Sequence, residues 1–94
     1  MSETQKRFFN ELLAKYPRLA EFWNREKREF QDEAAELALM GRLSPGEAVA
    51  LRALASIWMG GACGDYKLDF TDLATLTPEW RQPLLEWLSS PFWP

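Results

Sequence analysis

Apolar residues recur at helical spacing along most of this chain, and proline and glycine divide the recurrences into short segments. In the first segment, five apolar residues fall within about 140° of arc at 100° per residue, which is one face of a helix. These residues are Phe8, Phe9, Leu12, Leu13 and Tyr16. Ser2 and Gln5 have the spacing of a capping box, so Ser2 is the expected N-cap. Pro17 ends this helix or kinks it, and it also suits the first position of the next helix.

The next apolar stripe predicts a helix from Pro17 to about Met40, which Gly41 ends. The stripe consists of Leu19, Phe22, Trp23, Phe30, Ala34 and Leu37. Outside it lie three pairs of opposite charge, spaced four residues apart, that would support a helix. They are Glu21 with Arg25, Arg25 with Glu29, and Arg28 with Asp32.

Two acidic residues of this segment, Glu26 and Glu33, project into the apolar stripe. In one interpretation the helix overhangs the core or breaks near Arg25, so that both carboxylates stay in water. In the other, the carboxylates accept ion pairs from Arg42 or Arg52, or from the cations of a partner. A carboxylate that is buried needs such a partner, because leaving its charge unpaired is costly.

The clearest helix start is Ser44-Pro45-Gly46-Glu47, where Ser44 is the N-cap and Glu47 closes a capping box. The helix that follows, from Pro45 to Met59, carries only two charges and is apolar nearly all round. A helix of this kind is buried on several sides. We therefore expect it at the centre of the fold, with its main stripe among the most buried residues. That stripe consists of Leu51, Leu54, Ile57 and Trp58.

The last third of the chain predicts a loop, a short turn and a final helix. Residues 60–65 are rich in glycine and break the central helix. Residues 66–70 alternate apolar and polar side chains, but no second strand is available, so extended coil is expected. Asp69 or Thr71 can cap a short turn that runs through Leu76.

Thr77-Pro78-Glu79 then begins another helix. Pro83 lies too deep in this segment to be harmless, so the segment kinks there or a new helix begins at Pro83. One face of the helix carries Trp80, Leu84, Trp87 and Leu88. Residues 89–94 are expected to form a non-helical tail with two large aromatic side chains.

The pattern as a whole predicts an all-α fold. We expect a single domain over residues 1–94, built as a small bundle of about four to five short helices around the apolar helix at about residues 45–59. The composition agrees, because 47% apolar and 27% charged residues exclude a mostly disordered chain. A chain of 94 residues buries roughly 60–65% of its unfolded surface, so the core gives the folded state only a small margin of stability.

No segment has the character of a membrane span or a secretory leader. The longest run without a charge, from Ala53 to Gly64, has twelve residues, whereas a helix needs about 20 to span a bilayer. The first residues carry charges of both signs and lack the apolar stretch of about 7–15 residues that a leader needs. The single cysteine, Cys63, cannot form an intramolecular disulfide. We therefore expect a cytoplasmic protein.

The sequence contains no histidine, which excludes the commonest catalytic and metal-binding arrangements. Nucleophilic Ser–His–Asp and Cys–His sites lack their base, and one cysteine cannot complete a zinc site of nitrogen and sulfur ligands. Cys63 has no basic neighbour closer than Lys67 to favour the reactive thiolate. We interpret Cys63 as a small packed side chain.

Three aspartates, Asp65, Asp69 and Asp72, are spaced closely enough to be considered for a cation. They fail the EF-hand pattern, because Phe70 stands at the required glycine and Leu76 at the required glutamate. Helix capping explains them more simply. We predict no catalytic residue, no metal and no cofactor, and therefore no enzyme.

Aromatic residues give the remaining functional signal, since the chain holds five Trp, six Phe and two Tyr. Helical spacing places four of the tryptophans, Trp23, Trp58, Trp80 and Trp87, on inward stripes, whereas Phe92 and Trp93 lie in the tail. Tryptophan concentrates binding energy at interfaces, so these two residues are the best candidates for binding a partner. We expect the tail to fold back near Trp80 or Trp87, and the alternative is an exposed peptide that binds a partner.

Leu39 lies roughly opposite the predicted stripe of its helix, and Met40 flanks it. One apolar face is therefore left uncovered by a single chain. A homodimer is the simplest way to cover it, because two-fold pairing is the commonest closed arrangement.

These features predict a small protein that acts by protein–protein contact, as an inhibitor or adaptor of a larger bacterial, phage or plasmid assembly. The alternative is a DNA-associated regulator that uses Arg25, Lys27 and Arg28, the only basic cluster. Glu26 and Glu29 lie among these cations, whereas nucleic-acid binding requires an electropositive face. We therefore do not expect a nucleic acid or a membrane as the partner.

Overall fold

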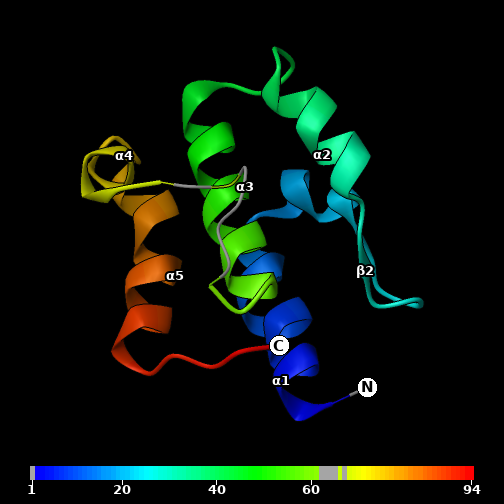
Figure 1. Cartoon of the computed structure of the whole chain (residues 1–94). Coiled ribbons are helices and arrows are strands. Elements are labelled where there is room, and N and C mark those ends of the chain that lie inside the picture. Colours follow the sequence, from blue (N-terminus) through cyan, green and yellow to red (C-terminus); the bar gives the residue numbers. More distant parts are fainter. Residues whose placement is uncertain (1, 62–65, 67) are drawn as a thin grey trace.

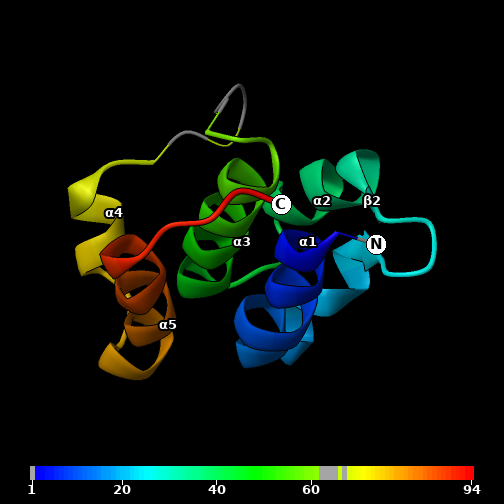
Figure 2. The same ribbon diagram turned by 90° about the horizontal axis from the view of Figure 1, so that it is seen from below.

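The fold is all-α, as predicted, apart from one short hairpin. The computed structural model describes residues 2–61, 66 and 68–94. Its elements are α1 (Glu3–Arg7), η1 (Phe8–Leu12), η2 (Leu13–Lys15), η3 (Pro17–Phe22), β1 (Trp23–Asn24), β2 (Glu29–Phe30), α2 (Asp32–Leu39), α3 (Pro45–Trp58), α4 (Phe70–Ala74) and α5 (Pro78–Ser89). Helix α3 runs through the middle, with α4 and α5 on one side and α1 and α2 on the other (Figure 1, Figure 2).

Ser2 begins the first helix through the predicted capping box. Its Oγ accepts the N–H of Gln5 at 3.2 Å, and Oε1 of Gln5 accepts the N–H of Ser2 at 3.4 Å. After α1 the helix widens into a π-type turn in η1 and tightens into a 3-10 turn in η2. It ends at Tyr16, whose φ is −129°, because Pro17 disfavours a helical residue before it. The predicted face is buried throughout, at Phe8, Phe9, Leu12, Leu13 and Tyr16.

The continuous helix predicted from Pro17 to Met40 is wrong, since this segment forms η3, the β1–β2 hairpin and α2. The two strands run antiparallel, with Trp23 opposite Phe30. The rings of these two residues lie 4.7 Å apart. Direct packing of an aromatic pair across the strands stabilises the hairpin at this point.

The hairpin turn lies where a break in the helix was one of the predictions, near Arg25. Oδ1 of Asn24 accepts the N–H of Lys27 at 2.9 Å, which closes the turn. Arg28 follows with a φ of 55°, in the left-handed region. Glu26 in the turn and Glu33 in α2 are both exposed, so the interpretation that leaves these carboxylates in water is confirmed.

Charge pairing differs from the prediction because residues 23–30 are not helical. None of the three predicted pairs forms among the described residues. Glu21 instead pairs with Arg42, whose Nη2 lies 2.6 Å from Oε1 of Glu21. Arg25 donates through Nη2 to Oδ1 of Asn10.

The buried side of α2 also differs from the prediction. Ala35 and Ala38 face the core, whereas Ala34 is exposed and Leu37 is 70% exposed. The hairpin resets the helical phase, so the stripe defined before it does not continue into α2.

Helix α3 begins at the predicted capping box. Oγ of Ser44 accepts the N–H of Glu47 at 3.2 Å, and Oε1 of Glu47 accepts the N–H of Ser44 at 3.0 Å. Trp58 is half-buried rather than fully buried as predicted, because it stands at the end of α3, where its ring packs 5.1 Å from that of Phe8. The rest of the predicted stripe is confirmed as buried, at Leu51, Leu54 and Ile57.

Asp69 caps α4, which is one of the two predicted possibilities. Its Oδ1 accepts the N–H of Asp72 at 3.0 Å, and Oδ2 of Asp72 accepts the N–H of Asp69 at 2.9 Å. The two carboxylates therefore satisfy the exposed N–H groups at the start of this short helix.

Helix α5 begins at Pro78, as predicted, and continues through Pro83 to Ser89. Of the two alternatives predicted at Pro83, a kink or a new helix, the new helix is therefore wrong. Because proline has no N–H, the carbonyl of Glu79, four residues before Pro83, accepts no helical hydrogen bond from it. Glu79 lies in the exposed first turn of α5, where water can bind this carbonyl instead. The non-helical tail begins at Ser90, one residue later than predicted.

Tyr16 connects the first segment to α5 on the far side of α3. Its side chain is fully buried, and its hydroxyl donates to the backbone carbonyl of Trp80. The two rings meet edge to face at 5.4 Å. Burial raises the pKa of Tyr16, so its hydroxyl remains a donor under all ordinary conditions.

Candidate functional site

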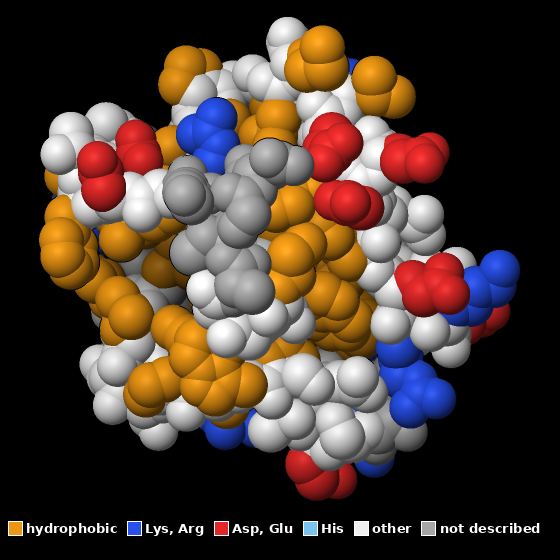
Figure 3. All heavy atoms as spheres, in the orientation of Figure 1, with side chains coloured by type: hydrophobic (Ala, Val, Ile, Leu, Met, Phe, Trp, Pro, Cys, Tyr) orange, Lys and Arg blue, Asp and Glu red, His pale blue; other side chains and the backbone are white. Residues whose placement is uncertain are grey.

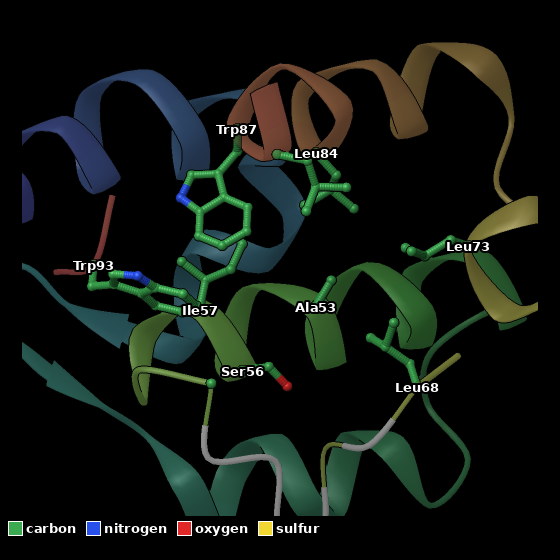
Figure 4. Close-up of a pocket in the computed structure, with 10 residues that line it drawn as sticks. Ala53, Ser56, Ile57, Leu68, Leu73, Leu84, Trp87 and Trp93 are labelled. Atoms are coloured by element: carbon green, nitrogen blue, oxygen red, sulfur yellow. The ribbon is translucent and has the colours of Figure 1, made fainter. Parts of the chain in front are cut away.

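An apolar groove lies between α3, α4, α5 and the C-terminal tail and encloses about 200 Å³. Figure 4 shows Trp87 and Leu84 projecting from α5 toward Ile57 and Ala53 on α3. Trp93 stands at one end of the groove, and Leu68 and Leu73 stand at the other (Figure 4). The lining residues are Ala53, Ser56, Ile57, Gly61, Leu68, Leu73, Leu84, Trp87, Leu88 and Trp93.

Small residues on and after α3 leave the space that the groove occupies. Ala53 and Ser56 are three residues apart on α3, and both line the groove. Gly61 has a φ of 86°, which glycine adopts readily and other residues rarely do. A Cβ at Gly61 would lie 3.5 Å from Cη2 of Trp93, so the tryptophan ring rests against this glycine.

The tail folds back onto α5, which confirms the prediction that it docks near Trp80 or Trp87. The indole of Trp87 meets that of Trp93 edge to face, with 5.1 Å between the ring centroids. The guanidinium of Arg7 lies 4.1 Å from the centre of the Phe92 ring, a cation–π contact that holds the tail to α1. Both aromatic residues that the sequence singled out in the tail are thus held beside the groove.

Large apolar side chains remain exposed on the elements that form the groove. Phe70 of α4 is 86% exposed, and Leu85 and Leu88 of α5 and Trp93 of the tail are about half exposed, at 44%, 50% and 51%. Figure 3 shows hydrophobic side chains gathered around a recess over α4, α5 and the tail. Exposed apolar surface of this extent, in contact with a groove, marks a binding surface more often than chance exposure does.

The chemistry that this site can perform is limited by its lining. Among the described residues none of the lining side chains ionises, and the one hydroxyl, that of Ser56, donates to the carbonyl of Tyr66 at 3.0 Å. The groove therefore supplies apolar contact area and no group for acid–base or nucleophilic chemistry. It suits the binding of an apolar side chain.

Leu39, predicted to bind a partner, is half-buried and packs against the core. The exposed apolar residues of that region are its neighbours, Leu37 at 70% and Met40 at 82%. The difference follows from the shifted phase of α2 described above. The structure therefore places Leu39 in a supporting position and does not bring it to the groove.

The predicted basic residues Arg25, Lys27 and Arg28 all lie on the exposed hairpin turn. They are brought together, but Glu26 lies between them in the turn and Glu29 follows directly at the start of β2. Arg25 is also held inward, because its guanidinium packs 5.5 Å from the centre of the Phe9 ring as well as donating to Asn10. The turn is a local charge cluster of both signs.

The carboxyl of Glu47 has a pKa below its ordinary value of 4.5. The backbone N–H of Ser44 contributes most to this, followed by its hydroxyl and then by the charges of Arg18 and Arg42. Nε of Arg18 lies 3.5 Å from Oε2 of Glu47. These groups anchor the start of α3 on the side away from the groove, so their role is to stabilise the fold.

The remaining candidates for reactive or metal-binding chemistry are Cys63 and the three aspartates Asp65, Asp69 and Asp72. Cys63 and Asp65 lie outside the described residues, and the carboxylates of Asp69 and Asp72 are used in the cap of α4. Within the described ranges, acidic residues and cysteine form no group of three or more that could hold a metal ion.

Comparison of the chain with protein-family models, with curated proteins and with solved structures gives no match. In the part of the chain that is described, helices long and apolar enough to cross a bilayer are absent. The functional inference therefore rests on the groove and on the surface around it.

Proposed function

We propose that this chain is a non-enzymatic interaction protein that binds another protein chain through the groove between α3, α4, α5 and the tail. The carrying observation is the combination of an apolar recess of about 200 Å³ with exposed large apolar side chains on the elements that form it. Protein interfaces have this composition, an apolar centre with aromatic anchors and few charges.

Binding would proceed by the entry of an apolar side chain of the partner between α3 and α5. Trp93 and Leu88, each about half exposed, would then become buried against it. The tail is already held by its contacts with Trp87 and Arg7, so little ordering is needed on binding. Apolar contact and pre-organisation together supply the affinity.

Site-specific photo-crosslinking tests this proposal. Benzoylphenylalanine is introduced at Leu88 on the groove and, as a matched control, at Leu37, an exposed leucine on α2. On irradiation in the cell of origin, we expect a discrete protein adduct from position 88 and none from position 37. Absence of an adduct at position 88, or equal adducts at both positions, would contradict the proposal.

The cellular role that we propose is that of an adaptor or inhibitor that acts by occupying a surface of a larger assembly. We propose the cytoplasm as its compartment, because a single cysteine cannot form the intramolecular disulfides typical of small proteins in oxidising compartments. Identification of the adduct by mass spectrometry tests both points, since a partner from outside the cytoplasm would contradict the assignment.

The alternative function, DNA association, has one supporting observation, the presence of Arg25, Lys27 and Arg28 on a single exposed turn. An electrophoretic shift at two salt concentrations tests it. Binding through phosphate contacts weakens steeply as salt rises, and a triple substitution of these residues to alanine would abolish it. We expect no shift, because Glu26 in the turn and Glu29 at the start of β2 place negative charges beside these cations.

A further inference from the structure

We infer that the chain bound by this groove is a second copy of the same protein, with Phe70 of each copy seated in the groove of the other. The inference rests on the proposed function, because it uses the same surface. The observation behind it is that α4 carries an exposed phenylalanine, Phe70, and also helps to form the apolar groove of about 200 Å³.

The size of the groove matches the side chain assigned to it. A dry apolar cavity of about 150 Å³ in a protein core can hold a benzene molecule, so about 200 Å³ admits a phenyl ring. Phe70 and Leu73 are three residues apart and lie on neighbouring positions of α4. Leu73 lines the groove, whereas Phe70 is absent from the lining and is 86% exposed. Phe70 is therefore available to another molecule.

Helix α4 supplies both Leu73, which lines the groove, and the exposed ring of Phe70, one helical turn away, and this closeness makes the surface around α4 self-complementary. When two copies meet about a two-fold axis, each ring enters the opposite groove, and both contacts form at once. Such a pairing is closed, so it ends at a dimer. A head-to-tail arrangement would leave one ring and one groove free and would propagate into a filament.

The area available fits a weak but specific dimer. Phe70 and Trp93 together expose on the order of 200–350 Å² per chain, taking about 150–250 Å² for a complete aromatic side chain. With Leu85, Leu88 and the groove walls, the two chains would bury roughly 800–1,000 Å² in total, which is below the area of stable interfaces and in the range of weak, transient ones. We therefore expect a dissociation constant in the micromolar range.

Charges on the two sides of this face are of opposite sign. Asp69 caps α4 and Asp72 lies within it, and α5 carries Arg81, which precedes Leu84 by three residues and Leu88 by seven, so it shares their side of the helix. When two copies pair about a two-fold axis and α4 of each packs on the groove of the other, the aspartates of one copy come close to the arginine of the other. Opposite charges in these positions favour the pairing and set its orientation.

Sedimentation of the full chain from about 10 to about 500 µM tests the inference. We expect the mass to rise from 10.9 kDa toward twice that value. Phe70→Asp should remain monomeric over this range, whereas Leu37→Asp, an equally polar change at an exposed site on α2, should dimerise like the wild type. Circular dichroism verifies that both variants keep their helices. A wild-type chain that stays monomeric, or a Phe70→Asp variant that still dimerises, would overturn the inference.

A mixing experiment tests the reciprocal exchange itself. Leu88→Lys places a charge at the groove and should also be monomeric. In a mixture of Phe70→Asp with Leu88→Lys, one native contact remains, and the other site places an aspartate beside a lysine. We expect the mixture to form a dimer that neither variant forms alone. A mixture that stays monomeric would contradict the exchange of Phe70.

This inference can fail while the proposed function stands. A monomeric wild-type chain that crosslinks from position 88 to a different protein would leave the groove as a binding site and remove the second copy as its occupant. Absence of any protein adduct from position 88 would contradict both.

Discussion

The indole N–H of Trp87 donates to the backbone carbonyl of Phe92 at 2.9 Å, and this hydrogen bond fixes the tail against α5. Because Phe92 is held, the ring of Trp93 is directed onto Trp87 and against Gly61. One wall of the groove is therefore built from residues that belong to no helix. The stability of the tail and the shape of the groove depend on the same contact.

Removal of residues 91–94 should lower the melting temperature of the isolated protein. The truncated chain loses the hydrogen bond from Trp87, the ring contact with Trp93 and the packing of Phe92 on Arg7. These contacts together contribute about 1–3 kcal/mol. Differential scanning calorimetry measures the change, and an unaltered melting temperature would show that the tail adds nothing to the fold.

Leu54→Ala should cost about 2–5 kcal/mol of unfolding free energy, because Leu54 is completely buried in α3. Such a loss is a large part of the stability of a domain of this size. The matched control is Leu37→Ala on α2, where the side chain is 70% exposed and the change should stay below about 1 kcal/mol. Urea denaturation distinguishes them, and equal effects would refute the central position of α3.

Gly61→Ala should destabilise the protein by about 1–2 kcal/mol, since residue 61 has a left-handed backbone that alanine adopts poorly. The control is Gly41→Ala, because a Cβ at Gly41 meets no atom within 4 Å and the backbone there is not left-handed. Thermal unfolding of the two variants should separate them clearly. A neutral Gly61→Ala variant would mean that the loop rearranges without loss.

Acid should remove the stabilising effect of Glu47. The pKa of this carboxyl is lowered in the folded protein, so its ionised form favours folding. The contribution is complete above the unfolded pKa of 4.5 and is lost as the pH falls through the folded value. We expect Glu47→Gln to be less stable than the wild type at neutral pH, with a smaller difference at an acid pH below 4.5. Urea titrations at both pH values measure it, and a difference that is equally large in acid would contradict this account.

The starts of several helices could be predicted from the sequence because capping is local. Ser2, Ser44 and Asp69 each find their partner three residues away, so spacing along the chain contains the whole interaction. The buried faces of the first segment and of α3 could be predicted for the same reason. In a continuous helix the spacing of residues along the chain determines which side of the helix each one occupies.

The hairpin could not be predicted, because its key pair satisfies two patterns. Trp23 and Phe30 are seven residues apart, which places them on one face of a helix and, equally, opposite each other in this hairpin. The choice is made by the turn at Asn24 and by packing of Trp23 on Phe8, at 5.4 Å between the rings. Contacts between residues so far apart in the sequence do not appear in its local periodicity. For the same reason the sequence did not predict which face of α2 is buried.

The groove could not be predicted from the sequence either, although Trp93, one of the residues that line it, was among the candidates for binding a partner. Its walls combine Ala53 on α3 with Leu73 on α4 and Leu84 on α5, which are far enough apart in the sequence that no local pattern brings them together. The only local signal was the pair of small residues, Ala53 and Ser56, on one side of α3. That signal indicates close approach of a neighbouring helix as readily as it indicates a recess.

The half-exposed position of Trp93 gives the protein a built-in optical reporter of its groove. Indole emission shifts to shorter wavelength when water is removed from around the ring, and Trp93 loses its water when the groove is covered. Trp23, which is 6% exposed in the core, is already shielded and contributes a constant background. Occupancy of the groove can therefore be followed in the unlabelled chain, in real time, from the colour of its own fluorescence.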